Sequence, residues 1–177
     1  ADALYAANVP PQPLLGLPIA VKAAFDFEGS VTSAGSKVLL GNPPALRDAT
    51  AVLRLRAAGA AILGTTNMTE FAMGGVGINP HFGTPLNPYD RGTGRIPGGS
   101  SSGSAIAVAD GIVPAAIGTD TAGSIQMPAA LCGIVGFKPT AKRVPLDGVV
   151  PLAPSLDSVG PLAISVACCA TVDSVLA

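Results

Sequence analysis

Apolar residues alternate with small or polar ones over several short stretches, which predict strands. Residues 14–22 (LLGLPIAVK) form the first such stretch, with side chains on alternating faces. One face carries Leu17, Ile19 and Val21, and the other carries Pro18, Ala20 and Lys22. After this strand we expect a helix that begins at an N-cap formed by Asp48 and stops at Gly59.

Strands continue to alternate with helices along the chain. Further strands are expected at residues 60–63, 112–118 and 133–137, and further helices at residues 66–73, 101–110, 124–131 and 165–176. Residues 74–99 form a long loop rich in Gly, Pro and Asn, and residues 138–161 are rich in turn-forming residues. This order predicts an α/β fold: a mixed, largely parallel sheet covered by helices on both faces.

The composition fits a sheet of this kind. Hydrophobic residues make up 49% of the chain and charged residues only 12%, and the mean hydropathy is +0.53. No apolar run reaches the roughly 18 residues that a membrane-spanning helix needs, so we expect no membrane span. A sheet buried on both faces explains the apolar balance instead. The net charge of −1, without a Lys/Arg cluster, argues against direct nucleic-acid binding.

The cysteines and the N-terminus bear on location and completeness. Cys132, Cys168 and Cys169 are odd in number and lack disulfide or metal-site spacing, which indicates a reducing compartment such as the cytoplasm. The first residues have neither the basic nor the apolar region of a signal peptide. Because the chain does not begin with Met, we expect some upstream sequence to be missing.

Several familiar catalytic arrangements do not fit this chain. A Ser–His–Asp triad would have to use His81, the only histidine. Residues 99–103 match the GxSxG pattern around Ser101, but a loop precedes them and His81 lies upstream, unlike the order in α/β-hydrolases. We therefore interpret His81 as a loop or packing residue. One histidine without CxxC cannot supply a zinc site, and Ser104 stands where a phosphate loop requires lysine.

Two loops rich in small residues remain as candidates. Residues 97–104 (PGGSSSGS) fit either a flexible linker or a catalytic serine loop at a helix N-terminus. Residues 118–128 lead from an apolar strand through small residues to Ser124, an arrangement that can aim N–H groups at one point as an oxyanion hole. A simple N-cap serine explains Ser124 equally well.

The predicted elements bring both loops to one edge of the sheet. A helix of about 10 residues leads away from Ser100 for ~15 Å, and a strand of about 6 residues returns for ~20 Å toward Ser124. Both serines would then lie at the carboxyl edge, where α/β proteins place their sites. Lys22 ends its own strand and can reach that edge, although such a lysine is more often a snorkelling residue than a base.

These segments resemble the amidase signature family. The matching segments follow the family's order and spacing from residue 14 onward, and they are residues 16–22, 64–71, 79–85, 97–103, 118–128 and 129–140. The resemblance implies the amidase signature fold, in a single domain over residues 1–177. It also implies hydrolysis of the C–N bond of carboxamides, with release of ammonia or an amine and without a cofactor or metal.

The resemblance also implies roles for individual residues. Ser124 holds the position of the nucleophile that forms the acyl-enzyme. Ser100 holds that of the bridging serine, whose peptide bond is cis in the family, and Lys22 that of the base. The oxyanion hole corresponds to the backbone N–H groups of Thr121, Ala122, Gly123 and Ser124. Because free lysine has a pKa of about 10.4, Lys22 must be desolvated to act as a base.

Three positions depart from the family pattern and leave the activity open. Ala23 replaces an acidic residue that usually follows the lysine, Ala122 replaces a glycine, and Gln126 replaces an arginine after the nucleophile. Three hypotheses therefore stand: an amidase acting on small carboxamides or aryl amides, the amidase subunit of a tRNA-dependent amidotransferase, and a catalytically inactive scaffold.

The expected partners and extent of the protein follow from the same resemblance. We expect a small-molecule amide as substrate, with part of its pocket in the loop of residues 73–88, and a homodimer is one assembly to consider. Family members are longer, so residues 1–177 are expected to be the catalytic core of an incomplete domain. Further strands and helices would follow Ala177 and cover an open sheet edge.

Overall fold

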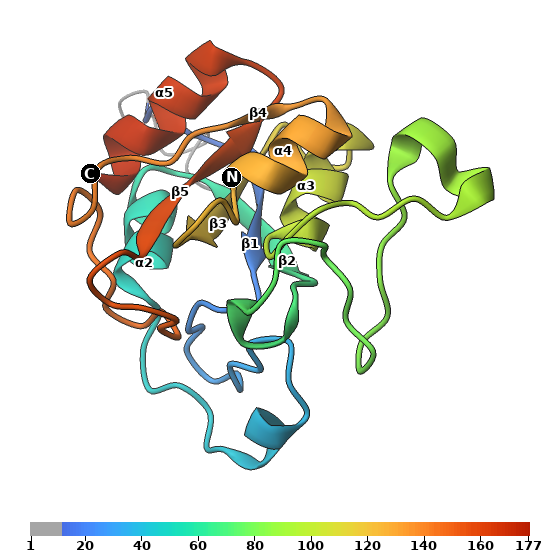
Figure 1. The fold of residues 1–177 in the computed structure, drawn as a ribbon. Helices are drawn as coiled ribbons and strands as arrows, with labels where there is room; N and C mark the ends of the chain where they lie inside the picture. Colours follow the sequence, from blue (N-terminus) through green and yellow to red (C-terminus); the bar gives the residue numbers. More distant parts are fainter. Residues whose placement is uncertain (1–11) are drawn as a thin grey trace.

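The computed structural model of the chain describes residues 12–177. Its centre is a five-stranded sheet in the order β2-β1-β3-β5-β4 (Figure 1). The strands are β1 (Pro18–Lys22), β2 (Ala61–Thr66), β3 (Ala115–Asp120), β4 (Val135–Gly136) and β5 (Ser158–Ala163). β1 pairs in parallel with β2 and β3, whereas β5 pairs antiparallel with both β3 and β4. Only β5 is reversed, so the predicted mixed, largely parallel α/β sheet is confirmed.

Helices lie on both faces of this sheet (Figure 1). The helices are α2 (Thr50–Ala57), α3 (Ser102–Ala109), α4 (Gln126–Cys132) and α5 (Val166–Leu176), with 3₁₀ turns η1 (Val38–Gly41), η2 (Glu70–Ala72) and η3 (Pro88–Thr93). α2 and α5 pack with one face of the sheet in the largest hydrophobic cluster. α3 and α4 pack on the opposite face in two smaller clusters.

The alternation of β1 decides which side chains face which helices. Ile19 and Val21 are fully buried in the cluster that also holds Val172 of α5. Ala20 packs instead with Ala107 of α3, which places the opposite face of the strand toward the α3 layer. Burial on both faces accounts for the high mean hydropathy. Among residues 12–177, the structure contains no helix with the length and apolarity to cross a membrane.

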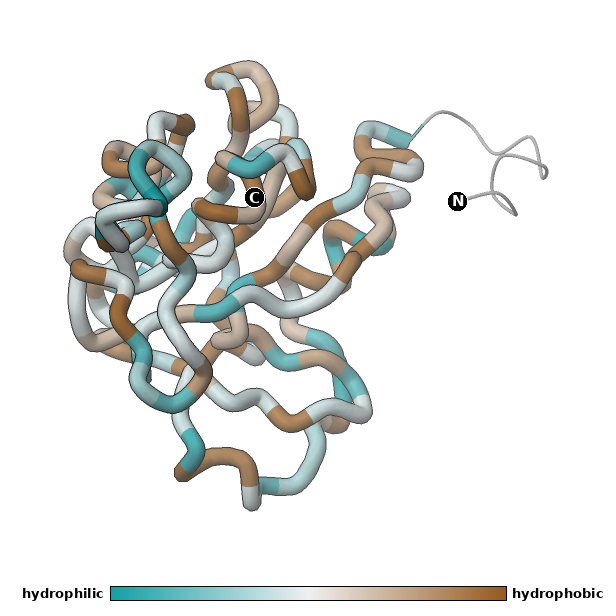
Figure 2. Tube along the Cα trace, turned by 90° about the vertical axis from the view of Figure 1, so that its right-hand side faces the viewer, coloured by the Kyte–Doolittle hydropathy of each residue, from teal (hydrophilic) through white to brown (hydrophobic). Residues whose placement is uncertain are grey.

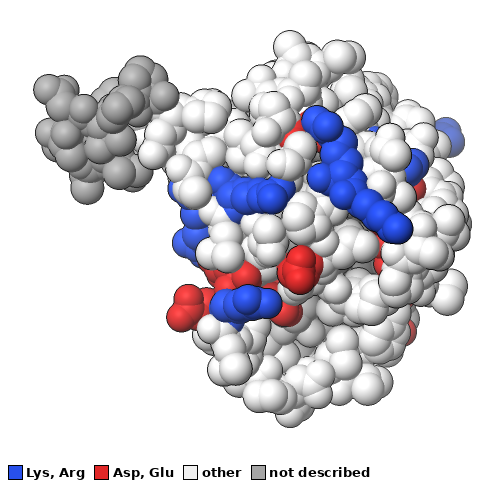
Figure 3. All heavy atoms as spheres, turned by 90° about the vertical axis from the view of Figure 1, so that its left-hand side faces the viewer, with Lys and Arg blue, Asp and Glu red and all other residues white. Residues whose placement is uncertain are grey.

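Hydrophobic and charged residues also lie at the periphery. Figure 2 shows brown, hydrophobic stretches in outer loops as well as in the central elements, and Val38 and Leu46 are largely exposed. On the face shown in Figure 3, Lys and Arg side chains lie among Asp and Glu side chains. The ion pairs Arg56–Asp48 and Arg143–Asp173 join opposite charges.

Two predictions in the N-terminal part of the chain are wrong. The first strand starts at Pro18 rather than at residue 14, because Leu17 N donates to the carbonyl of Leu14 and closes a turn before it. Asp48 does not cap α2. Its carboxylate accepts from the N–H of Glu28 and pairs with Arg56, so tertiary partners replace the local cap.

Three further boundaries differ because contacts outside each segment decide them. The helix expected at residues 66–73 is absent, since Thr66 extends the ladder of β2 with β1 and only η2 follows. The strand expected at residues 112–118 begins at Ala115, because the N–H groups of residues 112 and 113 close the end of α3. α4 begins at Gln126, two residues after Ser124, so Ser124 lies in the preceding turn.

β5 begins within residues 138–161, the segment that we expected to be turn-rich. Its Gly160 and Pro161 have low strand propensity, yet all six residues of the strand are buried. Pro161 needs no N–H there, and its carbonyl accepts from Phe137 N. Tertiary packing therefore overrides local propensity at β5. In contrast, the C-terminal helix predicted at residues 165–176 is confirmed, with the Ser165 side chain accepting from Cys168 N as N-cap.

Gly160→Ala is expected to lower the free energy of unfolding by about 1–3 kcal/mol, the usual cost of overpacking. A Cβ at this position would lie 2.2 Å from the backbone oxygen of Phe137, which cannot rotate away. Gly41→Ala is the matched control, since a Cβ there meets nothing within 4 Å. Urea denaturation of both variants measures the difference. Equal stability of the two variants would contradict the close packing between β5 and Phe137.

Candidate active site

A lysine, a serine and a threonine meet at the carboxyl edge of the sheet. Lys22 is the last residue of β1 and is fully buried. Its Nζ donates to Ser100 Oγ at 2.7 Å and to Thr119 Oγ1 at 2.6 Å. The parallel pairing of β1 with β3 brings the carboxyl ends of both strands together and so places Thr119 near Lys22.

The loop around Ser100 is held by backbone contacts on both sides. The Gly99–Ser100 peptide bond is cis, as the resemblance implies. The carbonyl of Ser100 accepts from Thr69 N at 3.1 Å, and Gly99 N donates to the Gly75 carbonyl at 2.7 Å. A Cβ on Gly99 would lie 2.7 Å from Gly77 N, so only glycine fits this approach. The loop is therefore tightly packed rather than a flexible linker.

Ser124 lies beside this loop. Ser101 N donates to the carbonyl of Ser124 at 3.1 Å and ties the two serine segments together. Ser124 is 6% exposed, and within residues 12–177 its hydroxyl makes no hydrogen bond, including none to Ser100. The structure thus joins Lys22 to Ser100 directly, and joins Ser124 to that pair through the backbone. A catalytic hydrogen bond such as one between the hydroxyls of Ser124 and Ser100 often forms fully only when substrate is bound.

Asp120, rather than a helix N-terminus, organises the turn of residues 121–124. Its carboxylate accepts from Gly123 N at 2.6 Å and from Ile125 N at 2.8 Å. Gln126 also donates to it, from its backbone and from its side chain. The Gly123 N–H is therefore engaged by Asp120. The N–H groups of the other expected oxyanion-hole residues have no acceptor in the described part of the chain; these are Thr121, Ala122 and Ser124.

Burial changes the acid–base behaviour of Lys22. Desolvation lowers the pKa of its ammonium from 10.5 to about 7, because a low-dielectric interior disfavours the charged form. The negative charges of Asp120 and then Asp157 act in the opposite direction and keep the pKa from falling further. A substantial fraction of Lys22 is consequently neutral near pH 7, which allows it to accept a proton.

Sequence reasoning missed Thr119, Asp120 and Asp157. Thr119 and Asp120 stand in residues 118–128, the run of small residues that leads to Ser124, and Asp157 stands in the turn-rich segment of residues 138–161. A signal was present in the sequence, because a lysine buried at a strand end requires polar partners. The chain order does not show which residues those partners are.

The remaining candidates contact groups outside the Lys22 and Ser100 pair. His81 Nε2 lies 3.2 Å from Glu70 Oε1, and His81 N donates to the side chain of Asn79. These contacts agree with its interpretation as a loop residue. Ser101 Oγ donates to the carbonyl of Thr119, which gives this buried serine a packing role. Within residues 12–177, no three His, Cys, Asp or Glu side chains gather as metal ligands.

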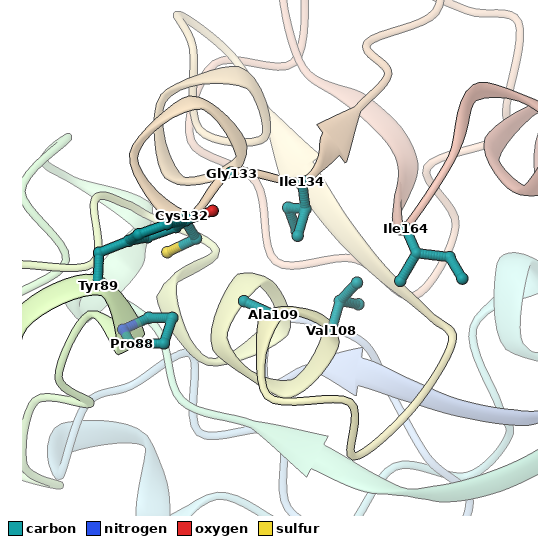
Figure 4. Close-up of a pocket in the computed structure, with 8 residues that line it drawn as sticks. All are labelled: Pro88, Tyr89, Val108, Ala109, Cys132, Gly133, Ile134 and Ile164. Carbon is teal, nitrogen blue, oxygen red and sulfur yellow. The ribbon is translucent and has the colours of Figure 1, made fainter.

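A separate hollow is lined by no residue of the two serine loops. Figure 4 shows its lining residues, most of which come from η3, α3 and the end of α4. Its volume is about 300 Å³. Its walls include the aliphatic side chains of Val108, Ile134 and Ile164, with the Cys132 thiol to one side. Cys132 Sγ donates to the Pro97 carbonyl, and burial raises the pKa of this thiol to about 11. The hollow therefore offers no reactive thiolate near neutral pH.

Comparison with known proteins points to a single family. The family model described as Amidase matches residues 1–177. AtzE of Pseudomonas sp. (strain ADP), which is a 1-carboxybiuret hydrolase subunit, is 56% identical over 75% of this chain and 28% of its own length. A glutamyl-tRNA(Gln) amidotransferase subunit of Cupriavidus taiwanensis is also 56% identical, over 75% of this chain and 26% of its own length.

The fold agrees with the same family. The crystal structure of the native peptide amidase from Stenotrophomonas maltophilia superposes with a TM-score of 0.90 and 43% sequence identity. The superposition covers 99% of this chain and 36% of that enzyme. The chain therefore spans about a quarter to about a third of the length of these relatives.

Proposed function

This chain belongs to the amidase family, and from that premise we propose that the natural polypeptide containing it hydrolyses the C–N bond of carboxamides through an acyl-enzyme on Ser124. The observation that carries the proposal is the fully buried Lys22, hydrogen-bonded to Ser100 and with its pKa lowered to about 7. A serine is a weak nucleophile unless a base removes its proton.

In the proposed mechanism, neutral Lys22 accepts a proton from Ser100 while Ser100 accepts one from Ser124. The Ser124 oxygen attacks the amide carbonyl, and the N–H groups of Thr121, Ala122 and Ser124 stabilise the developing oxyanion. The proton returns through Ser100 to the leaving nitrogen, which departs as ammonia or an amine. Water, deprotonated by the same relay, then hydrolyses the ester on Ser124.

Three cysteines without a disulfide support a cytoplasmic location, and a homodimer stays a hypothesis.

The substrate class has two candidates. The similarity to a 1-carboxybiuret hydrolase component favours a small, nitrogen-rich amide. The equal similarity to an amidotransferase component favours a second function, the release of ammonia inside a tRNA-dependent complex. Hydrolysis of simple amides by the isolated protein supports the first candidate. Activity that depends on co-purified partner proteins supports the second.

Labelling with a fluorophosphonate, followed by peptide mapping, tests the proposal. We expect the label on Ser124, because only an activated serine attacks this reagent at a useful rate. Ser124→Ala should abolish labelling, whereas Ser101→Ala should retain it. Labelling of Ser101 would move the nucleophile to the GxSxG segment. Absence of both labelling and amide hydrolysis would support the inactive scaffold.

A further inference from the structure

Asp157 connects the loop before β5 with the turn that carries Ser124. It directly precedes β5, whose Ser158 lies opposite Asp120 in the antiparallel ladder. This register sets Asp157 beside Thr121, and the Thr121 hydroxyl donates to the Asp157 carboxylate. The same carboxylate accepts from Leu152 N at 2.9 Å and from Ala153 N at 3.1 Å.

A carboxylate in this position requires compensating partners. Asp157 is 6% exposed, and a buried charge is costly unless hydrogen bonds compensate it. Two loop N–H groups would suffice for a residue that only closes the loop of residues 152–157. The Thr121 hydroxyl is a third donor, and it comes from the first residue after β3. The contact therefore reaches out of the loop into the candidate active site.

We propose that Asp157 is a positioning residue of this active site, which holds Thr121 so that the N–H groups of Thr121, Ala122 and Ser124 face the reacting carbonyl oxygen. The inference rests on the proposed amidase function and extends it to a residue in a different segment. Asp120 holds the far end of the turn through Gly123, and Asp157 holds its near end. With both ends held, the turn does not have to reorganise during the reaction.

Asp157 also acts on Lys22 through its charge. The negative charges that act on Lys22 are those of Asp120, at the end of β3, and of Asp157, directly before β5. Both favour the protonated lysine. Replacing Asp157 with the neutral asparagine removes one of these charges, so the pKa of Lys22 falls further. The ascending limb of the activity–pH profile then moves to lower pH.

Asp157→Asn in the natural polypeptide tests the proposal, with Asp173→Asn as the matched control. Asp173 is also buried, at 7% exposure, but it pairs with Arg143 on the α5 side of the sheet. For Asp157→Asn we expect kcat to fall about 10- to 100-fold, as for a misplaced catalytic group, with the ascending pH limb shifted downward. Asp173→Asn should keep the wild-type kcat and pH profile, even where its thermal stability falls.

A second pair of variants keeps the test decisive where Asp157→Asn fails to fold. Thr121→Val removes the hydroxyl and should lower kcat, whereas Thr121→Ser keeps it and should restore kcat. Wild-type kcat and pH profile in Asp157→Asn, or equal kcat in the two Thr121 variants, would overturn the proposal. If the wild-type protein neither hydrolyses amides nor labels at Ser124, the proposed function itself fails, and the two failures are thus distinguishable.

Discussion

Ser124→Ala is expected to remove amide hydrolysis almost completely while the protein stays folded. Loss of the nucleophile in a serine hydrolase lowers kcat by about 10⁴-fold or more, because no other group forms the acyl-enzyme. The Ser124 hydroxyl makes no hydrogen bond within residues 12–177, so its removal should change the free energy of unfolding by less than ~1 kcal/mol. The measurements are single-turnover hydrolysis and thermal unfolding.

Ser101→Ala serves as the control for Ser124→Ala. Ser101 is adjacent in space and buried, and among residues 12–177 its hydroxyl forms a hydrogen bond only with the Thr119 carbonyl. We expect it to retain kcat within about tenfold, since one neutral hydrogen bond is worth about 1 kcal/mol. A Ser124→Ala protein with more than a small fraction of the wild-type rate, with contamination excluded, would place the nucleophile elsewhere.

Lys22→Met is expected to lower kcat by about 10²- to 10⁴-fold, the range for loss of a general base. Methionine keeps the apolar stem but cannot accept the proton that Ser100 passes on. In the wild-type protein, kcat/KM should rise as the pH increases through about 7, where buried Lys22 loses its proton. This ascending limb should disappear in Lys22→Met.

Two further measurements test whether Lys22 is the base. His81→Ala should largely spare activity, since His81 contacts Glu70 rather than the serines. An equal loss of activity in His81→Ala and in Lys22→Met would contradict a mechanism without histidine.

The dependence of stability on pH gives the second measurement. In the unfolded chain Lys22 keeps its proton up to about pH 10.4, whereas in the folded protein it loses the proton near pH 7. The wild type should therefore lose stability relative to Lys22→Met as the pH falls between these values.

Local sequence patterns determined much of the fold. The period-2 alternation of residues 18–22 placed Ile19 and Val21 on one face of the sheet and Lys22 on the other. Apolar segments bounded by Ser, Gly and Asp predicted α3 and α5, because helix propensity and capping act over a few neighbouring residues. The resemblance to a family, carried by ordered motifs, singled out Lys22, Ser100 and Ser124 before any geometry was known.

Only the tertiary structure decided the surroundings of those residues. β5 forms despite Gly160 and Pro161, because its burial between β3 and β4 outweighs their poor strand propensity. The partners of Lys22 lie 78 and 97 residues away along the chain. Asp157 reaches Thr121, 36 residues away, only through the register of β3 with β5. Hydrogen bonds and desolvation depend on which atoms meet in space, and strand register sets those meetings over distances that no local pattern spans.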